Sequence, residues 1–327
     1  MTMDKYIVSF PEQLEDAMKI AEASNIEAST INAVVISGLG GSGIGGSLIT
    51  DLFSQDCKVP IIVNKDYSIP AFVNNQTLVI ISSYSGNTEE TIAAYEQAKL
   101  KNAKIIVVSS GGKIVEDAKR NNISCIILPG GNPPRTCLGY SFVQLVSILE
   151  KFKLISDGSL KSVETLANHL RNNLVQIQKV AFEISEKIGD KIPVIYGSSK
   201  TESVALRFRQ QINENSKMLC WHHVFPEMNH NELVGWASNQ ENIVVLIIKT
   251  DFENLRVLKR IEICEGIFKK YTKSVFEIGG HGETFLQQVF YLIHLTDWVS
   301  WYLAERKKVD AVEVNVIDFL KNELSKA

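Results

Sequence analysis

The chain has 327 residues, of which 45% are hydrophobic and 22% are charged. That length suffices for one large or two medium domains with a substantial core, and the composition is ordinary for a globular protein. The formal charge of -3 gives no electrostatic case for nucleic acid or an acidic membrane as a partner. With no apolar run as long as a membrane span and no N-terminal secretion signal, we expect a cytoplasmic protein.

The first half of the chain alternates β-branched apolar runs with helical patterns. Continuous apolar runs fit strands buried on both faces, as in parallel sheets. The expected strands are 33–37, 60–63, 77–82, 104–109 and 124–128, and the expected helices are 43–54, 87–101, 112–121 and 137–152.

A polar segment at 153–162, with Asp157-Gly158 at its centre, predicts a boundary between domains 1–153 and 154–327. The alternation of strands and helices then returns, so we expect two doubly wound α/β domains that arose by structural duplication. In the second half, the expected helices are 160–188, 202–213, 253–271 and 283–306, and the expected strands are 192–199, 242–248 and 274–278.

Two loops rich in glycine and hydroxyl residues follow two of the predicted parallel strands. The first spans 38–47, and the second, at 82–90, contains Ser83, Ser85 and Thr88. Such loops point backbone N–H groups and hydroxyls at an anion, and the helix dipole favours its negative charge. Together they predict a site for a phosphate group.

The first loop also matches Gly-x-Gly-x-x-Gly, the fingerprint of dinucleotide-binding folds. That fingerprint requires an acidic residue at the end of the second strand to hold a ribose. Here the strand ends in Asn64-Lys65, and Asp66 fits poorly. The hydroxyls of the second loop suit the three oxygens of a phosphate monoester better than a pyrophosphate bridge. A dinucleotide-dependent oxidoreductase stays as an alternative.

Two candidates for chemistry lie near predicted helix ends. Arg135 stands between two prolines and a helix start, where a guanidinium can hold a developing oxyanion, clamp a phosphate or form an ion pair. Glu214 is flanked by two asparagines, which indicate a backbone held away from regular helix. It is a candidate proton shuttle, with a surface carboxylate as the alternative.

Two further candidates lie in the second half. His230 is in a loop, 226–236, whose mixture of polar and aromatic residues is typical of a site; a loop histidine bonded to backbone is the alternative. Lys321, from its pattern alone, is an exposed lysine on an amphipathic terminal helix.

The cysteines and histidines give no metal-binding pattern. The five cysteines are odd in number and widely spaced, with no Cys-x-x-Cys, which indicates reduced thiols. His222, His223 and His230 have neither a cysteine pair nor a His-Glu-x-x-His motif beside them. We therefore expect no metal site.

These stretches together resemble the two-domain sugar isomerase (SIS) family, and most closely its bifunctional phosphoglucose/phosphomannose isomerases. The resemblance covers nearly the whole chain. The motifs that carry it are Gly-Gly-Ser-Gly-Ile-Gly-Gly at 40–46, Ser-Tyr-Ser-Gly-Asn-Thr-Glu-Glu-Thr at 83–91, Pro-Pro-Arg at 133–135, Asn-Glu-Asn at 213–215, Asn-His-Asn-Glu at 229–232 and Leu-Lys at 320–321.

The resemblance implies an aldose–ketose isomerase that interconverts glucose 6-phosphate and fructose 6-phosphate without a cofactor. It implies a homodimer in which His230 of one chain opens the sugar ring in the partner's site, assisted by Lys321. Glu214 would move a proton between C1 and C2, and Arg135 would stabilise the cis-enediolate. The residues implied to hold the sugar phosphate are Gly41, Ser42, Ser83, Ser85 and Thr88.

One departure from the family pattern leaves mannose 6-phosphate open as a second substrate. The family often has Asp-Pro-Thr-Pro before the terminal helix, with the threonine linked to acceptance of mannose phosphate, whereas this chain has Asp-Ala-Val-Glu at 310–313. A non-catalytic SIS protein that senses sugar phosphates is a further alternative, although such a protein needs only the two phosphate loops and not Glu214, His230 and Arg135.

Overall fold

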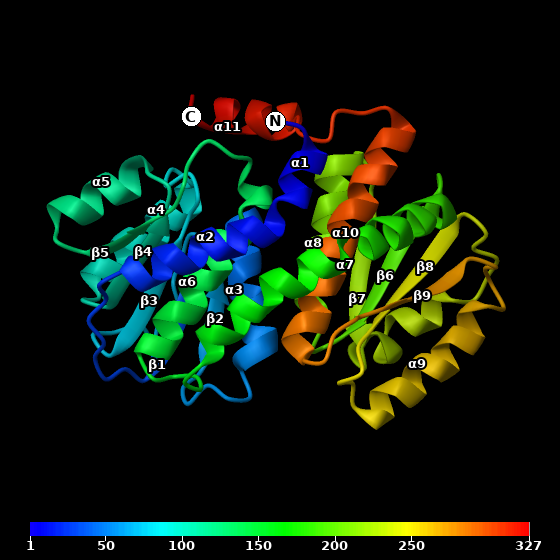
Figure 1. The fold of residues 1–327 in the computed structure, drawn as a ribbon, viewed down its shortest axis with the longest axis horizontal. Helices are drawn as coiled ribbons and strands as arrows, with labels where there is room; N and C mark the ends of the chain where they lie inside the picture. The colour runs from blue at the N-terminus through cyan, green and yellow to red at the C-terminus, as the bar shows by residue number, and fades with distance from the viewer. Residues whose placement is uncertain (327) are drawn as a thin grey trace. The chain divides into compact units, whose positions relative to one another are not determined.

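The computed structural model describes residues 1–326 and contains two parallel β-sheets flanked by helices (Figure 1). The strands are β1 (Ala33–Ser37), β2 (Ile61–Asn64), β3 (Thr77–Ser82), β4 (Lys104–Ser109), β5 (Ser124–Ile127), β6 (Ile192–Ser198), β7 (Trp221–Phe225), β8 (Ile243–Lys249) and β9 (Val275–Gly279). The helices are α1 (Met3–Val8), α2 (Phe10–Ala23), α3 (Gly40–Phe53), α4 (Glu89–Leu100), α5 (Gly112–Arg120), η1 (Pro134–Thr136), α6 (Leu138–Lys151), α7 (Ser159–Ile188), α8 (Glu202–Ser216), η2 (Glu227–His230), η3 (Glu232–Gly235), α9 (Leu255–Phe268), α10 (Phe285–Lys307) and α11 (Asn315–Leu324), where η marks a short 3-10 helix.

The chain forms two compact units. The N-terminal unit is Ser9–Asn172, and the C-terminal unit is Met1–Val8 together with the chain from Asn173 onward. Helix α7 contributes residues to both units. The boundary expected after residue 153 lies before this helix and stays a prediction.

The N-terminal sheet has the strand order β2-β1-β3-β4-β5, and all its neighbouring strands are parallel. Apolar residues of α4 and α5 pack with Val35, Val79 and Val107 on one face, and α3 and α6 cover the other (Figure 1). Because the strand order reverses between β1 and β3, ligands of such sheets bind at the carboxyl ends of these two strands. The two predicted phosphate loops follow β1 and β3 and therefore lie at this point.

Helix α3 begins at Gly40, three residues before the predicted start at 43, so the glycine run belongs to the helix itself. Close packing explains why a helix contains so many glycines. A Cβ atom on Gly41 would lie 2.7 Å from the carbonyl oxygen of Pro134, and one on Gly43 would lie 2.5 Å from that of Gly38. Glycine is required here for close backbone approach, which outweighs its low helix propensity.

The C-terminal sheet has the order β7-β6-β8-β9, again parallel throughout. This is the order of the N-terminal sheet without its fifth strand, and it confirms the prediction of two doubly wound α/β domains. Strand β7, at the edge, was missed by the sequence analysis.

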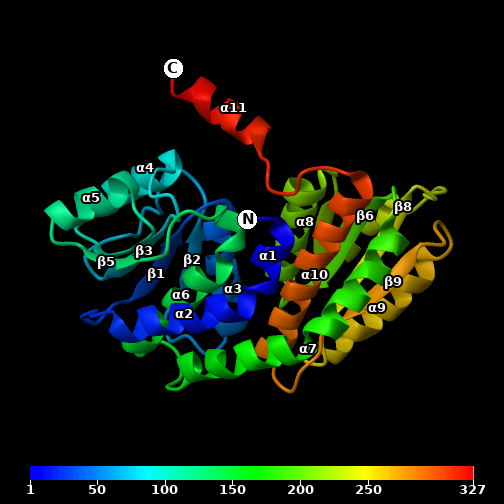
Figure 2. The same ribbon diagram turned by 45° about the horizontal axis from the view of Figure 1, so that its top comes forward.

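Helix α1 belongs to the C-terminal unit although it begins the chain. Its Ile7 carbonyl oxygen lies 3.0 Å from Nε2 of His294, a fully buried residue of α10. Both ribbon views show α1 beside α10 (Figures 1 and 2). Neither α1 nor α2 was predicted from the sequence.

Candidate active site

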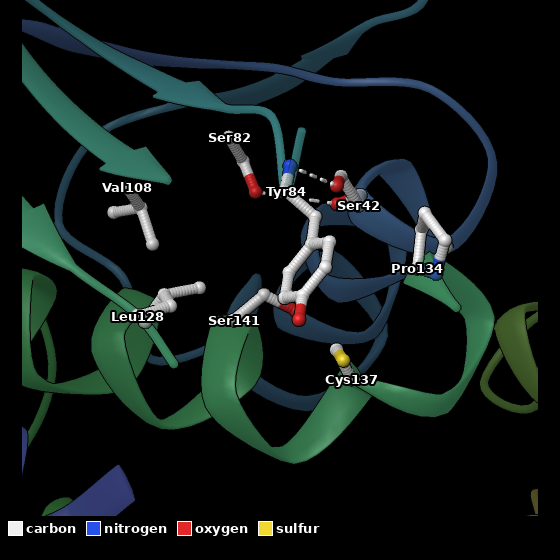
Figure 3. Close-up of a pocket in the computed structure, with 9 residues that line it drawn as sticks. Ser42, Ser82, Tyr84, Val108, Leu128, Pro134, Cys137 and Ser141 are labelled. Atoms are coloured by element: carbon white, nitrogen blue, oxygen red, sulfur yellow. Dashed lines mark hydrogen bonds between the residues drawn. The ribbon is translucent and has the colours of Figure 1, made fainter. Parts of the chain in front are cut away.

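The two predicted phosphate loops are joined directly at the carboxyl edge of the N-terminal sheet. The backbone N–H of Tyr84 donates to the Ser42 hydroxyl at 3.0 Å, and the Ser82 hydroxyl donates to the Ser42 carbonyl at 3.5 Å (Figure 3). The structure thus brings Gly41 and Ser42 of the first loop together with the second loop, as the sequence predicts.

The hydroxyls of Ser42, Ser85 and Thr88 all accept hydrogen bonds from the protein. Ser42 accepts from the Tyr84 N–H, Ser85 from the N–H of Asn87 at 3.3 Å, and Thr88 from the Ser83 hydroxyl at 3.2 Å. A backbone N–H can only donate, so the hydrogens of Ser42 and Ser85 must point elsewhere. Within residues 1–326 none of these three hydroxyls donates to a protein acceptor, so each keeps a hydrogen for an anion.

Two helices begin beside these hydroxyls. Helix α3 starts at Gly40, and helix α4 starts after Thr88, whose side chain does not cap the helix. The first N–H groups of a helix have no partner inside it, and the helix dipole adds positive potential there. The loops therefore offer both N–H and O–H donors to one region.

The second loop is held rigidly in place. Gly86 has φ +64°, and a Cβ atom on it would overlap the carbonyl oxygen of Gly111. The hydroxyl of Ser110 donates to the Tyr84 carbonyl at 2.6 Å, and the Asn87 side chain accepts from the N–H of Lys113 at 3.0 Å. These contacts fix the hydroxyls before any ligand arrives.

Arg135 lies next to the first loop. It is in η1, which follows two prolines, and is only 4% exposed. A Cβ atom on Gly41 would lie 2.9 Å from the Arg135 Cα atom, so the glycine lets the two backbones approach. The structure therefore brings Arg135 together with the phosphate loops within the N-terminal unit.

Glu214 lies in the last turn of α8, half-buried, in regular helix that continues to Ser216. The expectation of an irregular backbone at this point is wrong. The flanking asparagines instead brace the helix end: Asn213 donates to the carbonyl of Met218 at 2.6 Å, and Asn215 donates to the hydroxyl of Ser300 on α10 at 2.9 Å. The carboxylate is therefore carried on a fixed support.

His230 ends η2 and is exposed, whereas its neighbours are firmly held. The Glu232 carboxylate accepts from the Tyr196 hydroxyl at 2.6 Å and from the Trp221 indole at 3.0 Å, and Asn231 caps η3. In the described part of the chain the imidazole of His230 makes no hydrogen bond. Sequence reasoning missed Glu232, although it stands in the same motif.

Lys321 lies on α11, a helix on which every residue is exposed (Figure 2). No hydrogen bond or ion pair among residues 1–326 joins its side chain to Glu214 or His230. Lys217 makes an indirect link, because its Nζ donates to the carbonyls of Glu214 at 2.5 Å and Glu313 at 2.7 Å. The structure thus connects the end of α8 to the segment before α11, and among residues 1–326 no hydrogen bond or ion pair joins the three predicted residues.

The corresponding loops of the C-terminal unit use their hydroxyls internally. Ser198 and Thr201 lie 3.3 Å apart and bond each other and nearby backbone. The Ser199 hydroxyl donates to the Phe225 carbonyl at 3.1 Å, and the Thr250 hydroxyl donates to the Glu253 carboxylate. In the described residues of this unit, these loops therefore present no set of hydroxyls comparable to that of Ser42, Ser85 and Thr88.

The described residues contain no group of three or more His, Cys, Asp or Glu side chains arranged to hold a metal ion. None of the helices in residues 1–326 is both long and apolar enough to span a membrane.

Comparisons with known proteins place the chain in a family. Residues 32–130 match the SIS domain, and residues 177–324 match the bacterial phospho-glucose isomerase C-terminal SIS domain. The chain is 39% identical to the bifunctional phosphoglucose/phosphomannose isomerase of Caldicellulosiruptor bescii, over 99% of each chain. It is 35% identical to the enzyme of that name in Aquifex aeolicus, over 82% of each chain.

The fold is also found in solved structures. The C-terminal domain of glucosamine-fructose-6-phosphate aminotransferase from Francisella tularensis superposes with a TM-score of 0.74 at 16% identity, covering 95% of this chain and 97% of the other. At that identity the likeness concerns the fold alone, whereas the sequence relatives carry the assignment. The chain belongs to the bifunctional phosphoglucose/phosphomannose isomerase family of SIS-domain proteins.

Proposed function

We propose that this protein interconverts glucose 6-phosphate and fructose 6-phosphate, with mannose 6-phosphate as a second substrate. The names of its relatives support the reaction. The observation that carries the proposal is the set of hydroxyls of Ser42, Ser85 and Thr88, each of which accepts from the protein and keeps its hydrogen. A phosphate monoester dianion has three terminal oxygens that only accept hydrogen bonds. The three hydroxyl donors therefore match the three phosphate acceptors.

The phosphate site lies in the N-terminal unit in this proposal. Its donors are hydroxyls and helix N-termini, and Arg135 adds a positive charge beside them. The equivalent loops of the C-terminal unit use their hydroxyls internally.

The proton transfer is assigned to Glu214. A proton next to a carbonyl group is weakly acidic, so its removal needs a positioned base and an electrophile that stabilises the enediolate. Glu214 is partly accessible and sits on a braced helix end, which suits a base that must keep its position. Arg135 is the electrophile in this scheme, and no redox or metal cofactor enters the reaction.

Ring opening is assigned to His230 and Lys321, with His230 acting in the site of a partner chain. His230 is exposed on a loop whose neighbouring side chains are anchored, and it makes no bond of its own in the described residues. Exposed apolar side chains at Leu219, Trp221 and Val234 lie in and near the same loop and would be covered in a homodimer.

The dinucleotide alternative is disfavoured by the end of β2. Asn64 stands where the fingerprint requires an acid, and its side chain donates to the Ser37 hydroxyl at 3.3 Å and to the Asp66 carbonyl at 3.1 Å. The Asp66 carboxylate accepts from the N–H of Tyr67. Neither residue is set to hold a ribose.

A coupled assay of the purified full-length chain tests the proposal. Fructose 6-phosphate should be converted to glucose 6-phosphate and to mannose 6-phosphate with no added cofactor and in the presence of a chelator. Glu214→Gln should lower turnover by ~10²–10⁴-fold while sugar-phosphate binding persists. Binding without turnover by the wild-type chain would favour the sensor alternative, and a requirement for nicotinamide would favour the oxidoreductase.

A further inference from the structure

Tyr84 touches every loop that frames the anion site. Its backbone N–H donates to Ser42, and its carbonyl accepts from the hydroxyl of Ser110. Its ring extends below the second loop towards Cys137, which precedes α6, and Ser141 of α6, and the residue is 7% exposed (Figure 3).

The Tyr84 hydroxyl joins both ends of the turn formed by residues 129–132. It donates to the Pro129 carbonyl at 2.8 Å and accepts from the N–H of Asn132 at 3.2 Å. Burial raises the pKa of Tyr84 well above its ordinary value, so the group stays protonated and performs both roles.

The turn has few other supports. Gly130 and Gly131 contribute no side chains, and Gly131 adopts φ +89°. Within residues 1–326, no other hydrogen bond reaches the backbone of residues 129–132. The path of this turn therefore depends on one phenolic hydroxyl.

The turn leads directly to Arg135. Pro133 and Pro134 restrict the backbone between them, so a displacement of the turn is passed on to the arginine. The Pro134 carbonyl and the Arg135 Cα also pack against Gly41, with no room for a side chain. Arg135 is thus held by the first loop and by bonds within η1, where the Thr136 N–H donates to the Pro133 carbonyl at 2.9 Å. Tyr84 fixes the turn that leads into η1.

We infer that Tyr84 is a positioning residue that sets the place of the Arg135 guanidinium relative to the bound phosphate. This inference rests on the proposed function, in which Arg135 stabilises the enediolate. Displacing a catalytic group by about 1 Å can cost a large factor in rate without changing substrate binding. The Tyr84 hydroxyl should therefore influence turnover although it does not touch the substrate.

The kinetic test uses Tyr84→Phe, which keeps the ring and removes only the hydroxyl. We expect kcat for fructose 6-phosphate to fall about tenfold, with KM and the affinity for inorganic phosphate changed less than about twofold. In an Arg135→Lys background the same substitution should lower kcat less than about twofold. The lysine side chain is flexible, so the position of its ammonium group depends little on the exact position of the backbone. Equal losses in both backgrounds would overturn the inference.

Tyr95→Phe is the matched control. Tyr95 lies in the same unit and is 1% exposed, and its hydroxyl donates to Asp117 at 2.9 Å. Neither Tyr95 nor Asp117 belongs to the two predicted phosphate loops or to the turn at 129–132. This variant should keep wild-type kcat. A fall in kcat equal to that of Tyr84→Phe would show that loss of any buried phenol acts through stability, and would count against a specific role for Tyr84.

A second readout does not depend on activity. Trypsin cleaves after arginine, and Arg135 is buried in the native chain. Tyr84→Phe should raise the rate of cleavage after Arg135 several-fold over wild type and over Tyr95→Phe, because the turn is released. An unchanged rate, or a Tyr84→Phe chain that does not fold, would overturn the positioning role. If Arg135→Lys alone leaves kcat unchanged, the role proposed for Arg135 fails, and the cleavage rate still decides whether Tyr84 holds the turn.

Discussion

Ser42, Ser85 and Thr88 show how the direction of a hydrogen bond determines what a site can hold. The sequence identifies the residue types, because hydroxyls after parallel strands suit a phosphate. It does not reveal whether each hydroxyl donates or accepts within the protein. Ser199 in the C-terminal unit has the same side chain as Ser85 but gives its hydrogen to Phe225. Only the folded backbone distinguishes the two.

Ser85→Ala combined with Thr88→Ala should weaken the binding of fructose 6-phosphate and of inorganic phosphate alike. Each lost hydrogen bond to a charged oxygen is worth roughly 1.5–3 kcal/mol. Titration calorimetry measures both affinities, and Ser199→Ala serves as the control that should change neither. Unchanged affinity in the double variant would show that the phosphate does not bind at the second loop.

Arg135 could be predicted from the sequence as a site residue, whereas the contact made by Tyr84 could not. Two prolines before an arginine indicate a fixed cation, and the structure places Arg135 against the first loop. The support that Tyr84 gives to this arginine depends on a contact between residues more than forty positions apart. No local pattern encodes that contact.

Helices α8 and α10 are joined by a buried ion pair. The Arg207 guanidinium donates through Nε and Nη2 to both oxygens of Asp297, at 3.0 and 2.6 Å, and Gln211 adds a third hydrogen bond to the carboxylate. Arg207 and Gln211 precede Glu214 by one to two turns of α8, so this contact fixes the helix that carries the proposed base.

Arg207→Met should lower the free energy of unfolding by about 3–5 kcal/mol, because it leaves the buried Asp297 without its partner. Urea unfolding measures the change. Arg171→Met is the matched control: its pairs with Glu12 and Glu15 are more than a third exposed, and the expected loss is below about 1 kcal/mol. Similar decreases in the free energy of unfolding in both variants would mean that the contribution of an ion pair to stability does not depend on its burial.

His294, a buried residue of α10, makes the stability of the folded chain sensitive to acid. Burial lowers the pKa of His294 from 6.5 to about 4, partly opposed by the Ile7 carbonyl. Between these values the unfolded chain binds the proton and the folded chain does not, so stability present above pH 6.5 is lost as the pH falls towards 4.

The contribution of His294 to the free energy of unfolding should fall by about 2–3 kcal/mol between pH 7.5 and 4.5. His294→Gln cannot titrate, so its unfolding free energy should decline less steeply over this range than that of the wild type. Urea unfolding at both pH values gives the two slopes. Parallel slopes would show that another group controls the acid response.

The strands were predictable where hydrophobic runs are continuous. The strands β3 and β4 have the bounds predicted from the sequence, 77–82 and 104–109. Strand β7 was missed because His222 and His223 interrupt its apolar pattern. The start of α3 was misjudged because its glycines are selected by close packing and not by helix propensity.

At the scale of the whole molecule, the chain repeats one architecture but uses the two copies differently. The strand order 2-1-3-4 recurs in both sheets. In the proposed function, one copy supplies the hydroxyls that hold the phosphate, and the other carries Glu214 and His230. The sequence predicted the repeated plan. The different roles proposed for the two copies depend on the direction of individual hydrogen bonds, which the hydrophobic periodicity of the sequence does not reveal.

A homodimer with shared sites predicts complementation between two inactive variants. Chains with His230→Ala are mixed with chains carrying Glu214→Gln under conditions that exchange subunits. If His230 acts across the interface, each mixed dimer has one site with both defects and one with neither. Activity should recover to about a quarter of the wild-type total at statistical mixing. No recovery, with exchange confirmed independently, would place His230 in the site of its own chain.

The outward hydrogens of Ser42, Ser85 and Thr88 have a consequence for the form in which the substrate is bound. Magnesium ions in solution coordinate phosphate oxygens and occupy the lone pairs that these hydroxyls need. Three hydroxyls that direct their hydrogens at these oxygens compete with the metal ion for the same lone pairs. The protein should therefore select the metal-free ester, and its rate should follow the concentration of that species as magnesium is varied, not the total sugar phosphate.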